Sequence, residues 1–506
     1  MAIAACAIAP ILANCTSSPT TSEPGRGSTG SSGSSGGLGS GGLGSSGSNS
    51  SSGGSTSGAG SSSSSGSPGD DVSPTGDAGG IVLTADGAPA ACAANDMYAQ
   101  ASFVSLAVAP GTALVKGQGD AIPGSAAIAT PAGWDFHQGG LCRDGSPAGF
   151  YVHFSASNSD KLFIYLEGGG ACDSATFCTH NPANIEQVFA GGAASQGQTI
   201  AGSLSFTNNG QVPYTPSSGY SPGIFDFTNT ANPLKDWNAV YVPYCNGDVH
   251  FGTLDDVDIP SDGVVADLPH QHFVGGLNLK SYIARIVPTF PNMSQVVLTG
   301  ASAGAFGAGL NYGMVQDSFG LKTPVVVLED SGPSFSVTYE PGCVQKKWRT
   351  IWGLDAGLPS DCAECTMSDG SGLSNLQFYW LHKYPNARLG LVTTMEDEVI
   401  RLFYAQGENS CASDNATALT LSQALCGGYT CAKYTAGIND LVSTLSCTGR
   451  FAAYLIGGMN ANYMNPTYHQ HIFRDEFYQA ITNDGSITMA KWTADFLSGK
   501  GEIVGP

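Results

Sequence analysis

Short runs of apolar residues recur along the chain from residue 149 onward, separated by polar or helix-like segments. The strand-like runs cover residues 149–154, 161–166, 238–243, 295–299, 325–328, 388–394 and 451–456. Segments with helical spacing fit between and after them, at 277–286, 303–315, 397–404 and 487–497. Nearly continuous apolar strands that alternate with helices indicate a mostly parallel sheet covered on both faces. The pattern therefore predicts an α/β fold whose first two strands form an antiparallel pair.

The N-terminal part of the chain lacks this pattern. Residues 16–80 consist mainly of Gly and Ser, which offer too little apolar surface to offset ordering entropy, so we predict a disordered tether. Residues 1–15 are apolar and are typical of a short export leader that ends in a lipoprotein-type cysteine, Cys15. Lys and Arg are missing from this leader, and Asn14 stands where a small residue is usual; Cys6 fits better but requires a start further upstream. One packed domain is expected over residues 81–506.

Charge and cysteine content narrow the function classes. Net charge is −21, from 19 Lys and Arg against 40 Asp and Glu, so polyanions such as nucleic acid are repelled. No apolar run approaches the roughly 20 residues that span a bilayer, so we expect no transmembrane segment. The chain has 14 cysteines, which indicate disulfides and an oxidising compartment. We therefore expect a protein that is secreted or held at the cell surface by lipid on Cys15.

The cysteine spacing suggests where disulfides form without fixing the partners. Cys172 and Cys178 bracket a loop, and they can pair with each other or with Cys142 or Cys245. Residues 411–447 hold four cysteines and predict a disulfide-stapled insertion, either a lid or a decorated surface loop.

Two glycine-rich motifs carry the strongest chemical signal. Residues 300–304 read Gly-Ala-Ser-Ala-Gly after a strand and before a helix, which is typical of a serine nucleophile on a strained turn. We therefore predict Ser302 as the nucleophile. A glycine triplet at 168–170 follows an earlier strand, and such residues let backbone N–H groups approach a substrate oxygen. The predicted oxyanion hole uses the N–H groups of Gly169, Gly170 and Ala303.

A serine hydroxyl needs a histidine base, which a carboxylate orients in turn. In sheet-based hydrolases the chain order is Ser, acid, His. Of the nine histidines, only three follow the serine: His382, His469 and His471. His382 fits only if the acid comes very early. The two late histidines are the better candidates, and we favour His471 because a helix or turn continues directly after it.

The acid is expected at the start of a helix. Asp397 follows the strand at 388–394 and opens a helix, where a carboxylate is locally favoured and stays ionised. A helix-terminal acid with no catalytic duty would look the same. Asp330, just past the strand at 325–328, is the alternative acid, and Glu396 and Glu398 are less favoured. We choose Asp397.

These residues predict a serine ester hydrolase that works through an acyl-enzyme. No organic cofactor or metal is expected; the Cys362-x-x-Cys365 motif lacks an evident second ligand pair for zinc. Two alternatives use the same residues. One is a non-catalytic, surface-tethered carbohydrate-binding protein on a hydrolase fold, and the other is an acyltransferase, whose first half-reaction is identical.

The motifs resemble those of the pectin acetylesterase/Notum family of α/β-hydrolases. The resemblance runs from about Cys142 to His471 and rests on residues 142–149, 166–172, 244–248, 273–278 and 299–304, with Asp330-Ser331-Gly332 close behind. It implies an α/β-hydrolase fold, a nucleophile at Ser302, an acid in Asp397-Glu398 and a late histidine. It favours Asp397 over Asp330, because the family carries the second motif without using it as the triad acid.

The chain departs from the family in ways that bear on the substrate. Ala171 replaces an aromatic residue that is frequent near the oxyanion loop, and Ala305 replaces the second glycine after the nucleophile. The resemblance implies removal of acetyl groups from pectin or of a fatty acyl group from a protein. Lys346, Lys347 and Arg349 form the only evident basic cluster, so a neutral acetylated polysaccharide suits the charge better than pectin. We expect a monomer.

Overall fold

The main element of the fold is a nine-stranded sheet. The computed structural model describes residues 103–124, 130, 132–179, 181–189, 223–406, 411, 431–457, 469–482, 485 and 487–505. Contacts among these residues place them in one compact unit. The predicted leader and tether, 1–15 and 16–80, lie outside the described residues, so those boundaries stay predictions.

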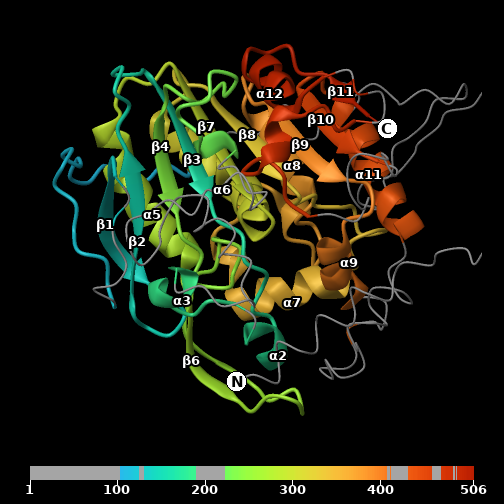
Figure 1. Cartoon of the computed structure of the whole chain (residues 1–506). Helices are drawn as coiled ribbons and strands as arrows, with labels where there is room; N and C mark the ends of the chain where they lie inside the picture. The colour runs from blue at the N-terminus through green and yellow to red at the C-terminus, as the bar shows by residue number, and fades with distance from the viewer. Residues whose placement is uncertain are drawn as a thin grey trace, which may run out of the picture. The chain divides into compact units, whose positions relative to one another are not determined.

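The strand order is the one that an α/β-hydrolase needs (Figure 1). Across the sheet it runs β1 (Trp134–Leu141), β2 (Pro147–His153), β4 (Asn238–Val242), β3 (Lys161–Leu166), β7 (Gln295–Ala301), β8 (Val325–Asp330), β9 (Leu389–Thr394), β10 (Phe451–Ile456) and β11 (Ile503–Val504). Every pair from β4 to β11 is parallel. The predicted α/β-hydrolase fold is confirmed.

The first strand pairing differs from the prediction. β2 is antiparallel to β1 and to β4, whereas β3 is parallel to β4 and β7. The segments at 149–154 and 161–166 are therefore separated by β4 instead of pairing directly. Adjacency in sequence suggested a hairpin, but β3 is buried on both faces and takes the central position that its continuous apolar run requires.

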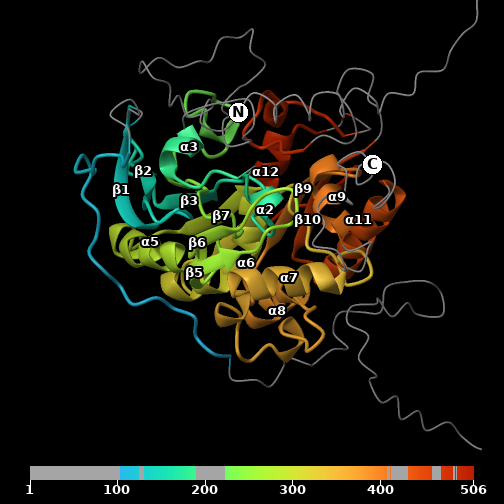
Figure 2. The same ribbon diagram turned by 90° about the horizontal axis from the view of Figure 1, so that it is seen from below.

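Helices cover both faces of the sheet (Figure 2). The longer helices are α5 (Gly275–Thr289), α6 (Ala303–Phe319), α7 (Gly342–Trp352), α8 (Asn375–Lys383), α9 (Glu398–Ala405), α11 (Cys431–Ser446) and α12 (Met489–Leu497). Along β3, Ile164 packs in the core shared with α5, α6, α8 and α11, and Tyr165 packs in the core shared with α12. This alternation follows from the two-residue period of a strand. The helix predicted at 487–497 is present as α12, and its Met489, Trp492 and Phe496 are buried.

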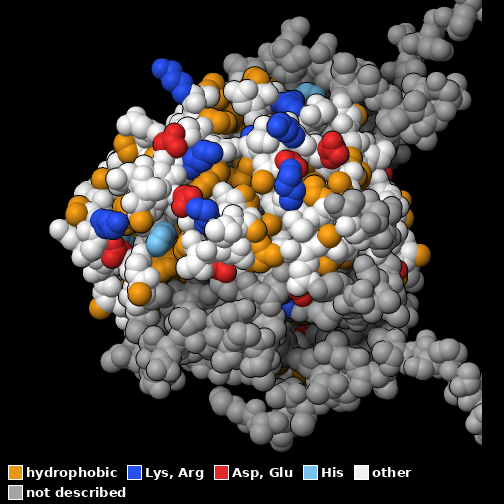
Figure 3. Space-filling view, turned by 45° about the horizontal axis from the view of Figure 1, so that its top comes forward, with side chains coloured by type: hydrophobic (Ala, Val, Ile, Leu, Met, Phe, Trp, Pro, Cys, Tyr) orange, Lys and Arg blue, Asp and Glu red, His pale blue; other side chains and the backbone are white. Residues whose placement is uncertain are grey.

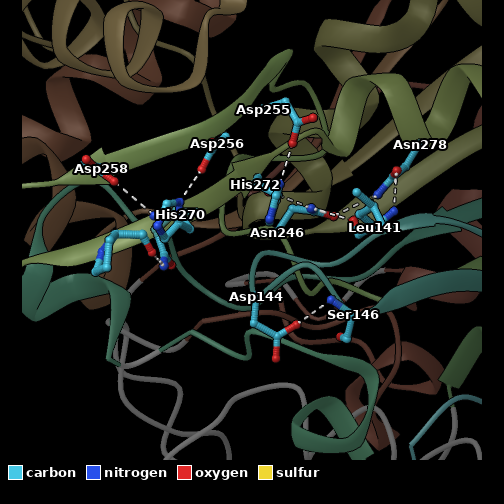
Figure 4. Close-up of polar contacts among 12 residues, drawn as sticks. Leu141, Asp144, Ser146, Asn246, Asp255, Asp256, Asp258, His270, His272 and Asn278 are labelled. Atoms are coloured by element: carbon cyan, nitrogen blue, oxygen red, sulfur yellow. Dashed lines mark hydrogen bonds and ion pairs between the residues drawn. The ribbon is translucent and has the colours of Figure 1, made fainter.

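A separate two-stranded hairpin, β5 (Leu254–Ile259) and β6 (Leu268–Phe273), was not predicted. Its outward residues are charged or polar, so it has no apolar run to detect. Two histidine–aspartate pairs join its strands, His270 with Asp256 and His272 with Asp255 (Figure 4). Asn246 ties the hairpin to the sheet by donating to the carbonyls of Leu141 and His272 at 2.9 and 3.0 Å.

Four disulfides lie within the described residues: Cys142–Cys245, Cys172–Cys178, Cys343–Cys411 and Cys362–Cys365. The first two resolve the pairing that the sequence left open. The C-x-x-C motif is itself a disulfide. Of the predicted insertion at 411–447, residues 412–430 lie outside the described residues, and Cys411 bonds back to α7 instead of closing the insertion on itself.

A buried carboxyl at the end of β8 makes stability depend on pH. Burial raises the pKa of Glu329 to about 8, and both of its oxygens accept from Gln377 Nε2 at 3.0 and 2.9 Å. Because the folded pKa lies above the ordinary value of 4.5, the folded state binds this proton more tightly. The contribution of this group to the free energy of unfolding is therefore greatest below pH ~4.5, and it is lost as the pH rises through about 8.

Glu329→Gln is expected to flatten the fall in unfolding free energy between pH 6 and 9, by on the order of a few kcal/mol at the alkaline end. Urea unfolding at several pH values measures this slope. Glu502→Gln, at an exposed position, is the control and should keep the wild-type slope. Equal slopes in wild type and Glu329→Gln would contradict the prediction.

Candidate active site

Ser302 lies on a sharp turn between β7 and α6. Its φ is 57° and its ψ is −122°, a conformation that L-residues rarely adopt and that is typical of a serine nucleophile elbow. Close packing requires glycine on both sides: a Cβ on Gly300 would lie 2.4 Å from the Gly304 carbonyl oxygen, and one on Gly304 would lie 1.9 Å from that of Leu166. The G-x-S-x-G spacing therefore reflects a real steric constraint.

The glycine triplet after β3 packs directly against this turn. A Cβ on Gly168 would lie 3.0 Å from Ser302 Cβ and 2.7 Å from Gln470 Nε2. Gly168 is thus in contact with the nucleophile and with the loop that carries the late histidines. The three segments that the sequence places far apart meet at this glycine.

The loop offers backbone donors beside the serine. Within the described part of the chain, the N–H groups of Gly169, Gly170 and Ala303 have no hydrogen-bond acceptor. The Gly169 carbonyl accepts from Asn181 Nδ2, and the Gly170 carbonyl accepts from the Tyr244 hydroxyl at 3.1 Å. These bonds fix the peptide planes of the loop. Three predicted oxyanion donors are therefore close to the nucleophile and unengaged, as an oxyanion hole requires.

A second layer of contacts holds the glycine loop in place. Arg143 Nη2 donates to the carbonyls of Cys178 and Asn181 at 2.9 and 3.0 Å, and the Cys172–Cys178 disulfide closes the segment between them. Burial lowers the pKa of Arg143 to about 10. No role was predicted for Asn181, Tyr244 or Arg143. Arg143 and Tyr244 lie within the family-like motifs, which was the only sequence signal for these two residues.

Asp397 forms a hydrogen bond with His469 and not with His471, the histidine that the sequence favoured. His469 Nδ1 lies 2.6 Å from Asp397 Oδ2, and Asp397 Oδ1 accepts from the N–H groups of Val399 and Ile400, both at 2.9 Å. Asp397 caps α9, as predicted, and both partners are buried. Among the described residues, His469 Nε2 has no hydrogen-bond partner. One imidazole nitrogen is therefore oriented and the other is unengaged.

The choice of His471 as the base does not agree with this arrangement. The Asp397 carboxylate holds His469, and burial, followed by the nearby His469, lowers the pKa of His471 to about 3. Burial therefore disfavours the protonated form of this ring. His471 lies in the core, where its side chain is buried.

Asp330 is not paired with either imidazole. Its Oδ2 accepts from the backbone N–H groups of His471 and Ile472 at 2.6 and 2.8 Å, and its carbonyl accepts from the Ser302 N–H at 2.8 Å. Ser331 Oγ accepts from the Gln470 N–H at 2.9 Å. The alternative acid therefore braces the histidine loop against the serine turn through main-chain bonds. The sequence signals for Asp330 were its place just past the apolar run at 325–328 and its place in the family-like Asp330-Ser331-Gly332.

Among the described residues, no hydrogen bond joins Ser302 Oγ and His469 Nε2. Ser302 and Gln470, the residue after His469, nevertheless both lie beside Gly168. Such bonds are often long in unliganded hydrolases and tighten when substrate binds. The described residues hold no cluster of three or more His, Cys, Asp or Glu side chains that could bind a metal ion.

An apolar pocket opens at the serine. Besides Ser302 and its neighbour in the turn, it is lined by Phe306 of α6, Trp348 of α7, Ile400 and Phe403 of α9, and small residues of the glycine loop. The first four are all buried or nearly so. Acyl groups of an ester are apolar, so the pocket is suited to the acyl side of a substrate.

The basic cluster on α7 does not form an open groove. Lys347 Nζ donates to Gln406 Oε1 at 3.0 Å and lies 3.7 Å from Asp173, and Arg349 is paired with Asp355 at 2.6 Å. On the face beside α12, basic side chains are interspersed with acidic ones (Figure 3). The described surface seen there offers no broad positive area for a polyanion.

Gly168→Ala is expected to lower kcat/KM for an ester substrate by about 100-fold, because the added methyl group displaces Ser302 or the histidine loop. Gly342→Ala is the matched control, since its Cβ would meet neighbours only at 3.4 and 3.5 Å. Both variants should remain folded by circular dichroism. Wild-type activity in Gly168→Ala would show that the close approach is unimportant.

Parts of the chain are similar to known proteins. The family described as Pectinacetylesterase matches residues 132–362, which include the glycine loop and Ser302 but end before Asp397 and His469. The palmitoleoyl-protein carboxylesterase notum2 of Xenopus laevis is 28% identical over 198 residues, 38% of this chain and 34% of that protein. Pectin acetylesterase 11 of Arabidopsis thaliana is 26% identical over 199 residues, 38% of this chain and 43% of that protein.

The chain thus spans about a third to two fifths of the length of these curated relatives. Among solved structures, that of the Wnt deacylase Notum from Drosophila superimposes with a TM-score of 0.44 at 20% identity, over 73% of this chain and 95% of that chain. None of the helices within the described residues has the length and apolar character needed to cross a membrane.

Proposed function

We propose that the chain, whose residues 132–362 match the Pectinacetylesterase family, is a serine carboxylic-ester hydrolase that uses Ser302, His469 and Asp397 as its triad. The observation that carries the proposal is the 2.6 Å pair between His469 Nδ1 and Asp397 Oδ2. It orients an imidazole on the loop that contacts Gly168 beside the elbow serine.

In the first half-reaction, Ser302 Oγ attacks the ester carbonyl carbon and its proton passes to His469 Nε2. Asp397 stays ionised, keeps the proton of the ring on Nδ1 and stabilises the imidazolium that forms. The tetrahedral intermediate then collapses. The bond to the alcohol oxygen breaks, His469 Nε2 returns the proton to that oxygen, and the acyl group remains on Ser302.

The negative oxygen of the intermediate is stabilised by the N–H groups of Gly169, Gly170 and Ala303. Ala303 is the first residue of α6, so the positive end of the helix dipole adds to its N–H group. The bond from Asn181 to the Gly169 carbonyl already fixes the peptide plane that carries the Gly170 N–H. Little reorganisation is therefore needed when the charge develops.

In the second half-reaction, water takes the place of the alcohol. His469 Nε2 accepts a proton from the water as it attacks the acyl carbonyl, and then returns a proton to Ser302 Oγ as the acid leaves. An acceptor sugar hydroxyl in place of water would give acyl transfer. Product analysis with an added alcohol distinguishes the two outcomes.

For the substrate, we propose an acetylated polysaccharide of low charge. The net charge of −21 and the engaged basic residues of α7 disfavour a polyanionic chain. Deacetylation of pectin is expected to rise steeply with salt, whereas deacetylation of a neutral acetylated glycan should be insensitive to salt. Equal and salt-insensitive turnover on both would contradict this choice.

The proposed location is outside the cytoplasm, with the protein secreted or anchored through lipid on Cys15, and acting as a monomer. The four disulfides support an oxidising compartment. Mass spectrometry of the purified protein from its host tests the lipid on Cys15. Light scattering tests the monomer.

The decisive experiment for the activity is labelling with a fluorophosphonate probe followed by mass spectrometry of the modified peptide. An adduct on Ser302, together with release of acetate from an acetyl ester, is the expected result. A protein that resists the probe and releases no acid from any ester would support the alternative, a non-catalytic carbohydrate-binding protein on the same fold.

A further inference from the structure

We propose that Trp348, held by Asp173, forms the end wall of the acyl pocket and limits the acyl group to about the size of acetyl. This inference rests on the proposed esterase activity, because it concerns the acyl side of the same site. Trp348 is then a specificity-determining residue, and Asp173 is a positioning residue that acts through it.

The pocket is narrow. Its cavity volume is about 20 Å³. A cavity of roughly 10–15 Å³ holds one water molecule, which is similar in size to a methyl group. The space beside Ser302 therefore suits the methyl group of an acetyl ester and has no room for a chain of eight carbons.

Aromatic rings set this limit. Trp348 packs edge to face on Phe306, with ring centroids 6.3 Å apart, and stacks on Trp352 behind it at 5.6 Å. Both tryptophans are buried. Trp348 is thus backed by a second indole, so a longer acyl chain cannot push it aside without disturbing α7.

Asp173 fixes the orientation of this wall. Trp348 Nε1 donates to Asp173 Oδ2 at 2.9 Å, and Gln406 Nε2 donates to the same oxygen at 3.2 Å. Lys347 Nζ lies 3.7 Å from the other oxygen, which balances the charge of a carboxylate that is fully buried. A buried charge with these partners is costly to leave unpaired, so the indole is held in one position.

The position of Asp173 links the wall to the catalytic loop. It follows Cys172, whose carbonyl accepts from Trp352 Nε1 at 2.9 Å and whose sulfur bonds to Cys178. Both indoles of α7 therefore bind the segment that continues the oxyanion loop. The depth of the pocket and the position of the oxyanion donors are set by the same short stretch of chain.

The test compares kcat/KM for p-nitrophenyl acetate, butyrate, hexanoate and octanoate. For the wild type we expect a fall of at least 100-fold from acetate to octanoate, since each methylene that the pocket rejects costs about 10-fold or more. Trp348→Ala should reduce this ratio at least 10-fold by raising octanoate turnover. Trp348→Phe, which keeps most of the bulk, should retain the preference for acetate.

Asp173 supplies a second comparison that does not require removal of the ring. Asp173→Asn keeps an oxygen that can accept from the indole, so it should retain the chain-length profile. Asp173→Ala should broaden the profile while the kcat for acetate changes less than the ratio. A merely structural role would lower activity on all four esters equally in Asp173→Ala and would overturn the positioning role.

The outcomes separate the inference from the activity on which it rests. A wild type that hydrolyses none of the esters and resists the fluorophosphonate probe contradicts the proposed function. A wild type that hydrolyses acetate and octanoate equally well contradicts only the inference. So does a folded Trp348→Ala whose profile matches the wild type. If Trp348→Ala does not fold, an unchanged profile in folded Asp173→Ala overturns the inference instead.

Discussion

Replacing Ser302 by alanine is expected to lower kcat/KM for an acetyl ester by at least about 10⁴-fold, because no other group can form the acyl-enzyme. Some activity above that of water remains, since the oxyanion donors at Gly169, Gly170 and Ala303 are still in place. The Ser302 side chain makes no capping hydrogen bond to α6, so the variant should keep nearly the wild-type melting temperature. Initial rates with an acetyl ester give the loss.

Two controls make the result specific. Ser281→Ala removes a hydroxyl from the exposed part of α5 and should leave activity and probe labelling unchanged. In Ser302→Ala, labelling by the fluorophosphonate should disappear along with the activity. If Ser302→Ala keeps more than a tenth of wild-type kcat/KM, another nucleophile or a different site must be responsible.

Replacing His469 by asparagine is expected to lower kcat/KM by about 10³-fold or more, because the serine then lacks a base and the alcohol lacks an acid. His471→Asn should act differently. That ring is buried and kept neutral, so its replacement should reduce the free energy of unfolding while the remaining folded enzyme keeps activity within about 10-fold. Initial rates corrected for the folded fraction separate the two effects.

The comparison of His469→Asn with His471→Asn is informative because the two histidines lie on either side of Gln470 in the same loop. An Asp397→Asn variant should resemble His469→Asn in its loss of kcat, since the amide no longer stabilises the imidazolium. A severe loss of activity in His471→Asn with a tolerant His469 would reverse the assignment. Equal losses in both, with normal stability, would show that the loop as a whole is required.

The parallel core of the fold could be predicted from the sequence, because β3, β7, β8 and β9 are continuous apolar runs. The edges of the sheet could not. β1 and β5 carry polar residues at alternate or successive positions, and β11 has only two residues. Their pairing depends on neighbouring strands, such as β10 for β11. The local pattern of apolar and polar residues does not indicate these partners.

Candidate site residues could be predicted where the backbone conformation restricts which residue types are possible. Ser302 needs glycine neighbours, and Asp397 is a favourable residue at the start of a helix, so both positions could be identified. The choice between His469 and His471 depends on which ring reaches Asp397. Gln470 between them has a φ of 70°, and this turn sends the two side chains to different environments in a way that spacing alone cannot indicate.

One consequence follows from the two oxygens of Asp397. Oδ1 anchors the first turn of α9 and Oδ2 steers the imidazole, while Ile400 and Phe403 of the same helix line the cavity beside the serine. In the proposed mechanism, the rate of the chemical step and the fit of the substrate therefore depend on the same carboxyl group. An enzyme altered at this position should change which esters it prefers as well as how fast it works.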